Sequence, residues 1–327
     1  MKKIVSVLLS LFISVAIPAW AKDPLPSWND GPNKSAIITF VEKTTQAQSP
    51  DFVAPAQRIA VFDNDGTLWS EQPTYVDYQF TLDRIKYLAP GKPEWKTQQP
   101  FKAVLENDET ALKAAGEEGL IQLTLATQAG MSTEAFQNIV SQWLSTEQHP
   151  TYKRPYTELT FKPMHEVLDY LKENGYKNYI VSGAGVEFMR VWTEKVYGIP
   201  PEQVIGTSIK TKFEIRDGQP ELIGMPEMQF MNNAGDKAVS IHQVIGRRPI
   251  AAFGNSDGDL AMLQWVTSGK GASLGLLVHH TDAERESAYD RKSSVGRLDK
   301  ALDQAQLKNW IVVDMKSDWA QIFPNPP

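Results

Sequence analysis

The sequence predicts an α/β fold, a Rossmann-like parallel sheet with helices on both faces, together with an inserted all-helical module and a small β-hairpin. Short, mostly β-branched apolar runs recur at wide intervals, and amphipathic helical patterns lie between them. Strands that alternate with helices indicate a parallel sheet covered on both faces. A third observation, a long stretch without any strand pattern, indicates that a helical module interrupts the sheet.

The predicted strands are short, mostly apolar and flanked by turn residues. This pattern is typical of strands that are buried on both faces of a sheet. The runs are residues 58–62, 178–181, 249–253, 272–278 and 310–313.

The helices between these strands are predicted from apolar residues at helical spacing. Residues 164–174, 186–197 and 237–245 are each followed by a glycine, which readily takes the left-handed conformation that ends a helix. Residues 35–46 form a further predicted helix after an irregular arm, residues 22–34.

Two insertions interrupt the alternation of strands and helices. The first, residues 69–155, reads as several helices separated by proline and glycine: 75–88, 101–115, 119–128 and 133–145. The second, residues 204–223, alternates around Asp217-Gly218 and predicts a hairpin. The domain prediction is therefore a core of residues 22–70 and 156–327, with a helical module over 71–155.

The N-terminus has the layout of a secretory signal peptide over residues 1–21. Lys2 and Lys3 precede an apolar run, and Ala19-Trp20-Ala21 is a small-x-small cleavage pattern. The apolar run is shorter than the roughly 20 residues of a membrane span. We therefore expect cleavage after Ala21 and a periplasmic or secreted protein.

The amino-acid composition argues against several further classes of protein. The chain contains no cysteine, which closes the lipoprotein route and excludes disulfides. A formal net charge of −6 argues against nucleic acid or an anionic membrane as a partner after signal cleavage. The oligomeric state is not determined by these features.

Polar or glycine-rich segments follow four of the predicted strands. Because ligands of open parallel sheets bind beyond the carboxyl ends of the strands, these segments should meet at one edge. They are Asp63-Asn64-Asp65-Gly66-Thr67, Ser182-Gly183-Ala184-Gly185, Gly254-Asn255-Ser256-Asp257-Gly258-Asp259 and His279-His280-Thr281-Asp282.

These residue types suit phosphoryl chemistry. Asp63 and Asp65 could hold Mg²⁺, which prefers oxygen ligands and binds few carboxylates. One aspartate could attack phosphorus while the other serves as general acid and base. Ser182 and the amide of Gly183 could bind phosphoryl oxygens, and Lys237 could neutralise developing charge.

DNDGT after a strand, Ser-Gly after a second, a lysine and then GNSDGDLAML resemble the four motifs of the haloacid dehalogenase (HAD) superfamily. A helical insertion after the first motif is similar to the C1 cap of its phosphoserine-phosphatase-like branch. The resemblance implies that Asp63 is the nucleophile and Asp65 the general acid/base, with Mg²⁺ as cofactor. It also implies that Thr67 orients Asp65 at the phosphate, and that Ser182, Gly183 and Lys237 bind the phosphate.

The fourth motif departs from the family pattern. Asn255 stands where the usual metal-binding aspartate stands, and Asp259 matches the last aspartate. The resemblance therefore implies a metal site of Asp63, Asp65, Asn255 and Asp259, with Asp257 as a further candidate. Glu71 and Gln72 do not match the spacing of the phosphoserine enzymes' substrate glutamate, so that substrate is not carried over.

Each candidate has a simpler structural interpretation. Asp63 and Asp65 could form a polar turn, Ser182 or Asp257 could cap a helix, and Lys237 could lie on the surface. An EF-hand is disfavoured because no terminal glutamate follows at loop spacing. His279 and His280 are expected to be structural rather than metal ligands. Five aromatic residues lie in or beside the module: Trp69, Tyr75, Tyr78, Tyr87 and Trp95. We expect most of them to pack in its core and a minority to face the site.

The sequence thus predicts an exported, Mg²⁺-dependent phosphatase that hydrolyses a small phosphomonoester through an aspartyl-phosphate. Two alternatives use the same scaffold: a phosphomutase, or a phosphonate hydrolase with Lys86, Lys96 or Lys113 as a Schiff-base lysine. A third is a degenerate protein that binds a phosphorylated ligand without turnover, which Asn255 keeps open.

Overall fold

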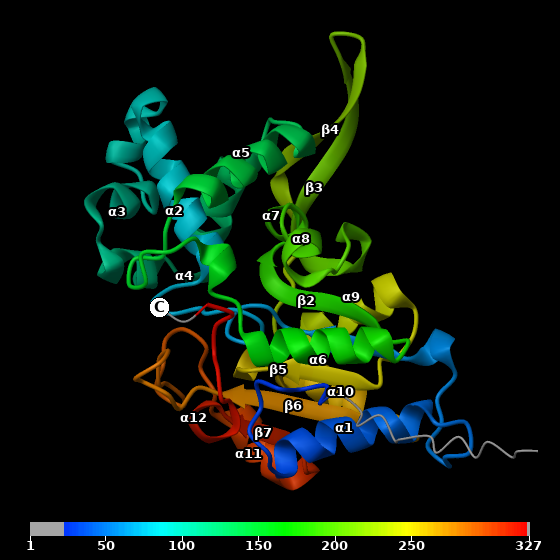
Figure 1. Cartoon of the computed structure of the whole chain (residues 1–327). Helices are drawn as coiled ribbons and strands as arrows, with labels where there is room; N and C mark the ends of the chain where they lie inside the picture. Colours follow the sequence, from blue (N-terminus) through cyan, green and yellow to red (C-terminus); the bar gives the residue numbers. More distant parts are fainter. Residues whose placement is uncertain (1–22, 326–327) are drawn as a thin grey trace, which may run out of the picture.

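The computed structural model describes residues 23–325. The predicted signal peptide, residues 1–21, lies outside the described residues. A sheet flanked by helices forms the lower part of the molecule, and the inserted helices and a long hairpin stand above it (Figure 1). Within residues 23–325, no helix combines the length and apolar composition needed to cross a bilayer.

The sheet confirms the predicted fold class. Its seven strands run in the order β4-β3-β2-β1-β5-β6-β7, and every pair except β3–β4 is parallel. The five predicted strands are present, and β1 lies at the centre between β2 and β5. The strands are β1 Ile59–Phe62, β2 Lys177–Gly185, β3 Val204–Arg216, β4 Gln219–Phe230, β5 Ala251–Gly254, β6 Leu274–His279 and β7 Ile311–Asp314.

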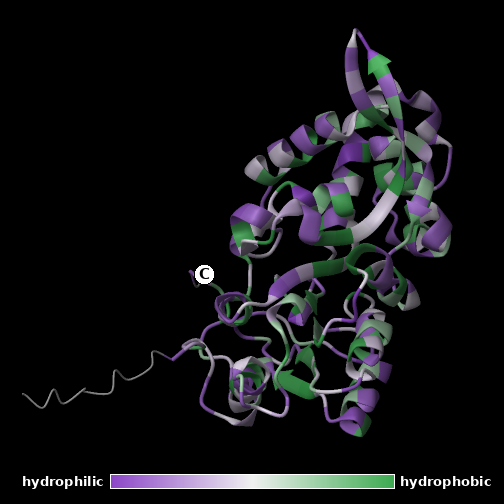
Figure 2. Cartoon of the chain, turned by 90° about the vertical axis from the view of Figure 1, so that its right-hand side faces the viewer, coloured by the Kyte–Doolittle hydropathy of each residue, from purple (hydrophilic) through white to green (hydrophobic). Residues whose placement is uncertain are grey.

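Both faces of the sheet are covered, which explains why β1 consists of four buried apolar residues. Phe62 faces the side of α1 and α6 and stacks on Phe253, with ring centroids 4.2 Å apart. Val61 faces the other side, where α9, α10 and α11 pack. These helices are α1 Pro32–Thr45, α6 Lys162–Glu173, α9 Gly235–Ile245, α10 Leu260–Thr267 and α11 Lys300–Lys308. Along their turns the helices alternate between polar and apolar colours, as amphipathic helices do (Figure 2).

One predicted helix of the core is divided in two. Residues 186–197 form α7, Val186–Arg190, and α8, Thr193–Tyr197. Trp192 leaves the helical conformation, with φ −130 and ψ −19, and its ring stacks on Trp69 at 4.4 Å. Tertiary stacking therefore overrides a continuous helical pattern.

The insertion is helical, as predicted, with α2 Val76–Leu88, α3 Phe101–Glu106, α4 Glu109–Gln128 and α5 Thr133–Thr146. The single helix predicted over 101–115 is wrong. Asn107 takes a left-handed conformation, φ 53, and ends α3. Asp108 then caps α4 by accepting a hydrogen bond from the amide of Ala111 at 3.0 Å. An Asn-Asp pair thus supplies a stop and a start that apolar periodicity does not reveal.

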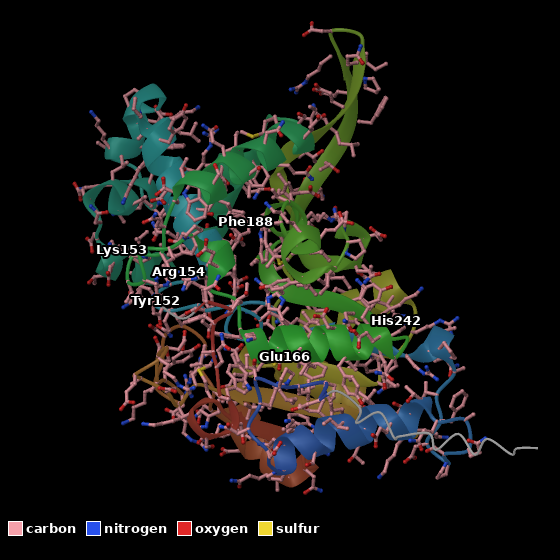
Figure 3. All side chains as sticks on the ribbon, viewed as in Figure 1. Tyr152, Lys153, Arg154, Glu166, Phe188 and His242 are labelled. Carbon is pink, nitrogen blue, oxygen red and sulfur yellow. The ribbon has the colours of Figure 1, made fainter. Side chains whose placement is uncertain are left out.

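The inserted helices are attached to the core by aromatic packing and by hydrogen bonds. Phe188 of α7 packs against Phe80 of α2, with ring centroids 5.5 Å apart, and Figure 3 shows Phe188 beside the inserted helices. Gly224 of β4 exchanges backbone hydrogen bonds of 2.9 Å with Gly130 and Met131. The hairpin predicted over 204–223 is present and extends to Phe230. Helices and hairpin together therefore form the roof above the sheet.

The N-terminal arm is irregular up to Pro32, as predicted, but it belongs to the core. Leu25 and Trp28 are buried, and Trp28 packs edge-on against Trp319 at 5.8 Å. The indole of Trp28 donates a hydrogen bond to the carbonyl of Pro163, at the start of α6. The first described residues therefore fasten the two ends of the core together.

His165 predicts a pH-dependent stability. Burial lowers its pKa from 6.5 to about 4, and within the described residues its buried Nε2 has no hydrogen-bond partner. The unfolded chain therefore takes up a proton that the folded chain rejects, and stability falls as pH drops from about 6.5 towards 4. We expect His165→Leu to gain about 1–3 kcal/mol relative to wild type between those values. Urea unfolding at several pH values between about 4 and 6.5 measures the gain. A difference in the free energy of unfolding between variant and wild type that does not change with pH would contradict the prediction.

Candidate active site

The first motif forms a tight loop directly after β1. The carbonyl of Asn64 accepts hydrogen bonds from the amides of Thr67 at 3.1 Å and Leu68 at 2.8 Å. Gly66 has φ +73, and a Cβ there would lie 2.0 Å from Nδ2 of Asn255. Only glycine satisfies both the left-handed backbone and this close approach. The loop thereby presents Asp63 and Asp65 at the carboxyl edge of the sheet.

Lys237 joins the first motif to the fourth. Its Nζ lies 2.6 Å from an oxygen of Asp63 and 2.6 Å from an oxygen of Asp259, and all three side chains are buried. Burial and the nearby Asp259 carboxylate raise the pKa of Asp63 to about 8, while Lys237 opposes that shift. The surface interpretation of Lys237 is therefore wrong, because α9 directs this lysine into the site.

Asp65 is held by a residue that the sequence did not point to. The indole Nε1 of Trp69 donates a hydrogen bond of 2.9 Å to Oδ1 of Asp65, and Ser182 donates to Oδ2 at 3.4 Å. We expected Trp69 to pack an inserted core, but it lies under the first motif, stacked on Trp192. Burial raises the pKa of Asp65, and the hydrogen bond from Trp69 opposes the shift. In the sequence, the only indication of this contact is that Trp69 lies four residues after Asp65.

Asp259 holds the lysine and the fourth motif rather than an open metal position. One of its oxygens faces Lys237, and the other accepts hydrogen bonds from the amides of Asn255 at 3.0 Å and Ser256 at 3.1 Å. Its side chain is fully buried. Because both oxygens are engaged, we reassign Asp259 from metal ligand to partner of Lys237.

Asp257 turns away from the site. Its Oδ1 accepts hydrogen bonds from the amides of Asp299 and Ala301, both at 2.9 Å, at the start of α11. Asp257 therefore holds the start of the distant helix α11 rather than the helix at Gly258, which Ser256 caps, and its role as a metal ligand stays a prediction.

Thr67 and Asn255 form a buried pair under the loop. Thr67 Oγ1 donates to Oδ1 of Asn255 at 3.2 Å, and Nδ2 of Asn255 donates to Oε1 of Glu71 at 2.7 Å. Neither Thr67 nor Asn255 lines the cavity. The hydroxyl of Thr67 is directed to Asn255 in this structure, and its role at the phosphate stays a prediction.

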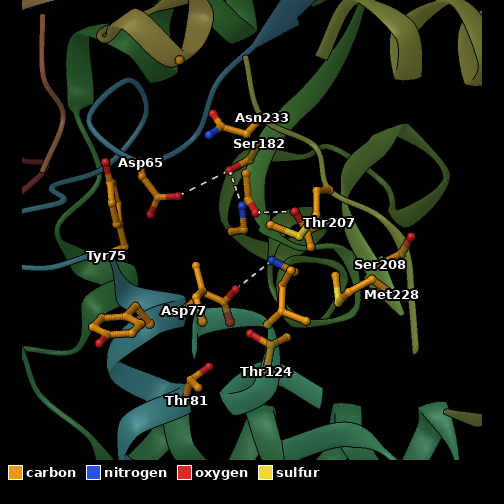
Figure 4. A pocket seen from close by; sticks show the side chains of 18 of the residues that line it. Asp65, Tyr75, Asp77, Thr81, Thr124, Ser182, Thr207, Ser208, Met228 and Asn233 are labelled. Carbon is orange, nitrogen blue, oxygen red and sulfur yellow. Dashed lines mark hydrogen bonds between the residues drawn. The ribbon is translucent and has the colours of Figure 1, made fainter. Parts of the chain in front are cut away.

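A cavity of about 230 Å³ lies between the first motif, the inserted helices and the hairpin. Asp63, Asp65, Ser182, Gly183 and Lys237 all line it, so five sequence-predicted site residues meet there. Figure 4 shows Asp65 and Ser182 at one end of the cavity, facing Thr124 and Thr81 on the inserted helices.

The roof contributes further residues that the sequence did not assign. Asp77 of α2 accepts a hydrogen bond of 2.8 Å from the amide of Gly185 and points into the cavity (Figure 4). Burial raises the pKa of Asp77 to about 6. Tyr75 and Tyr78 also line the cavity, whereas Tyr87 is exposed and Trp95 stacks on Phe101 within the inserted helices. The expected division of the aromatics is therefore wrong, because only Trp95 packs within the inserted helices, while Tyr75 and Tyr78 line the cavity.

The histidines after β6 are structural. Nε2 of His280 lies 2.7 Å from the carbonyl of Gly66, and Nδ1 lies 3.1 Å from Glu286. His279 lies 3.6 Å from Asp290 near the surface. His280 therefore supports the first-motif loop from behind, as the structural interpretation expected.

Residues 60–264 match the family model of haloacid dehalogenase-like hydrolases. The chain belongs to this family. The matched segment runs through all four motifs, from Asp63 to Asp259, which confirms the resemblance seen in the sequence. In a comparison with curated proteins, none matches the chain.

Solved structures share this fold at low identity. A conserved protein of unknown function from Anaerococcus prevotii DSM 20548 has a TM-score of 0.53 and 14% identity, covering 92% of this chain and 98% of its own. A protein of unknown function from Bordetella pertussis Tohama I has a TM-score of 0.49 and 16% identity, with coverages of 79% and 99%. A probable phosphoserine phosphatase from Vibrio cholerae has a TM-score of 0.42 and 16% identity, with coverages of 81% and 62%. Of these three, only the Anaerococcus prevotii structure has a TM-score above 0.5, and at 14% identity that likeness shows the fold alone.

The residues of this haloacid dehalogenase-like hydrolase fit a divalent cation. Four carboxylates are buried around the first motif, those of Asp63, Asp65, Glu71 and Asp259. Within residues 23–325, Lys237 is the one buried cation that contacts any of them, and it contacts Asp63 and Asp259. No three His, Asp or Glu side chains of that range form a ready-made metal cluster. Mg²⁺ does not require one, because it binds through one or two carboxylates and completes its shell with water and phosphate oxygens.

Lys237 is expected to be essential for stability as well as for the site. Lys237→Met would leave the Asp63 and Asp259 carboxylates buried without their cation, at a cost of about 3 kcal/mol in the free energy of unfolding. Chemical unfolding in urea measures this loss. The double variant Lys237→Met/Asp259→Asn should recover part of it, because it removes one of the two unpaired charges. A loss below about 1 kcal/mol would contradict the pairing.

Proposed function

We propose that this protein is an exported, Mg²⁺-dependent phosphatase that hydrolyses a small phosphomonoester through an aspartyl-phosphate on Asp63. The observation that supports this most directly is the arrangement at the cavity floor. Asp63 lies beside Lys237, and Asp65 is held between Trp69 and Ser182 at the same end of the cavity. A nucleophile and a separately positioned acid thus face one ligand space.

In the first step, a carboxylate oxygen of Asp63 bonds to phosphorus and the bond to the leaving oxygen breaks. Asp65 gives its proton to that oxygen, and burial, which raises the pKa of Asp65, favours this role as general acid. In the second step, Asp65 accepts a proton from water as the water oxygen bonds to phosphorus. The bond between Asp63 and phosphorus then breaks and releases phosphate.

The remaining residues bind and orient the phosphoryl group. Ser182 and Gly183 line the cavity next to Asp65, and Lys237 lies against the nucleophile. A bound Mg²⁺ would offset the charge of Asp63 and of the phosphate oxygens. The Asp63 carboxylate and, by family resemblance, the backbone carbonyl of Asp65 would hold it.

The lining of the cavity favours a leaving group that carries no second negative charge. Lys237 is the only cationic side chain among the described lining residues, and it is already shared between Asp63 and Asp259. The lining also includes apolar Leu120, Ile121 and Met228, together with the carboxylate of Asp77. A phosphomonoester with a partly apolar leaving group that ends in an amine or ammonium matches this surface.

The alternatives receive less support. The cap lysines considered for phosphonate cleavage are exposed and do not line the cavity: Lys86, Lys96 and Lys113. Export follows from the predicted signal peptide and is part of the proposal. N-terminal sequencing of the protein from a periplasmic fraction should begin at Lys22.

The proposed chemistry predicts a Mg²⁺-dependent turnover that requires Asp63. Wild type should hydrolyse an aryl phosphate only when Mg²⁺ is present, and Asp63→Asn should lower kcat by about 10³-fold or more. Asp169→Asn, an exposed aspartate on α6, serves as the matched control and should keep wild-type activity. Absence of turnover in the wild type would favour a ligand-binding protein, and activity in Asp63→Asn would contradict the aspartyl-phosphate.

The substrate class is tested separately with esters of similar size and different charge. Phosphocholine should have a higher kcat/KM than phosphoserine, because the phosphoserine carboxylate meets no free cation in the cavity. Asp77→Asn should lower kcat/KM for phosphocholine by about tenfold or more while changing that for glycerol phosphate by less than about threefold. Equal losses for both esters would show that Asp77 has only a structural role.

A further inference from the structure

The Asn255–Glu71 pair is not explained by the proposed chemistry. Asn255 stands where the family pattern has a metal-binding aspartate, so this chain carries one negative charge fewer at that point. Glu71, which follows the first motif, is buried within 1% exposure and lies directly against Asn255. Position 255, which lacks the usual carboxylate, and the additional carboxylate of Glu71 are therefore neighbours.

The hydrogen bonds of Asn255 fix which of its side-chain atoms faces Glu71. Nδ2 of Asn255 donates to Oε1 of Glu71 at 2.7 Å, while Oδ1 of Asn255 accepts from Thr67 at 3.2 Å. An aspartate at position 255 would place a second carboxylate at that distance from Glu71, in a buried site where like charges repel strongly. Glutamate at 71 and asparagine at 255 are thus compatible, whereas glutamate and aspartate are not without a cation between them.

The fold leaves space for this carboxylate. A Cβ on Gly66 would lie 2.4 Å from Oε1 of Glu71, and a Cβ on Gly296 would lie 1.7 Å from it. Tyr289 also donates a hydrogen bond to Oε1 at 2.8 Å. Two glycines and a tyrosine therefore form a slot that fixes the carboxylate next to the first motif.

No side chain of the described residues supplies a positive charge to Glu71, and burial raises the pKa of its carboxyl well above the ordinary value. Its described hydrogen-bond partners, Asn255 and Tyr289, are neutral, and no Lys, Arg or His within residues 23–325 forms a salt bridge with it. Glu71 also lines the cavity that contains Asp63 and Asp65. A buried carboxylate that faces a ligand space without a cation is costly unless a ligand supplies the positive charge.

We propose that Glu71 carries the negative charge displaced from position 255 and is, with Asp63, the second acidic residue that binds the divalent cation. In this arrangement the acidic residue stands in the segment after the first motif rather than in the loop after β5, and Asn255 is its hydrogen-bond donor. This proposal rests on the proposed function, because the cation is the one that phosphatase chemistry requires. The competing role for Glu71 is recognition of a substrate amine.

Metal binding without substrate separates these roles. Isothermal titration of Mg²⁺, and Mn²⁺ titration followed by electron paramagnetic resonance, would be run on the mature chain in phosphate-free buffer. Glu71→Gln should weaken the cation affinity by about tenfold or more. Asp77→Asn, a cavity carboxylate on the cap side, is the matched control and should change the affinity by less than about twofold.

The charge swap gives the sharper test. Asn255→Asp/Glu71→Gln moves the carboxylate back to position 255 and should restore the affinity to within about threefold of wild type. Asn255→Asp alone should lower the melting temperature without Mg²⁺ and increase the stabilisation that Mg²⁺ provides. This single variant keeps Glu71, so it remains informative if Glu71→Gln does not fold.

Unchanged Mg²⁺ affinity in Glu71→Gln would overturn the proposal, and so would a double variant that binds no better than Glu71→Gln. Loss of activity on amine-bearing esters with intact cation binding would assign Glu71 to substrate recognition instead. The outcome is independent of the proposed function. A wild type that binds Mg²⁺ without hydrolysing any ester would refute the phosphatase, while the Glu71 result would still stand on its own measurement.

Discussion

An excess of buried negative charge at the carboxyl end of β1 is the constraint on which the rest of the structure depends. Asp63, Asp65, Glu71 and Asp259 lie in or against the first-motif loop, and Lys237 contacts two of them. Burying such charges is costly unless each one is paired or hydrogen-bonded. The loop amides on Asp259, the indole on Asp65 and the asparagine on Glu71 are the contacts that keep the charges in place.

The same constraint explains why the supporting shell is rigid. Trp69 can orient Asp65 only because its ring is stacked on Trp192, which in turn interrupts the helix after β2. His280 supports the loop from behind through the carbonyl of Gly66. A catalytic carboxylate that must be protonated in one step and ionised in the next needs fixed partners rather than solvent. Local irregularities in the fold therefore serve the geometry of the site.

The roof of the cavity is built from two separate parts of the chain. The inserted helices and the hairpin are joined by backbone hydrogen bonds at Gly224 and packed on the core through Phe188, so they cover the cavity together. Their contribution to the cavity mixes apolar side chains, such as Leu120 and Ile121, with hydroxyl groups, two tyrosines and Asp77. The cavity floor thus carries Lys237, and the roof carries the carboxylate of Asp77.

The sequence by itself determined the fold class, the strand positions, the helical insertion and the first-motif aspartates, because these depend on local periodicity and on the rule that strand ends share an edge. Ser182, Gly183 and Lys237 were also brought to the cavity as predicted. Only the tertiary structure decided the roles of Thr67, Asp257, Asp259 and Trp69, since each depends on which partner lies across a contact from a distant segment. The pairing of Asn255 with Glu71 spans 184 residues of sequence and so leaves no periodic signal. The first motif indicated the proposed chemistry, and the tertiary packing decided which side chains contact that motif.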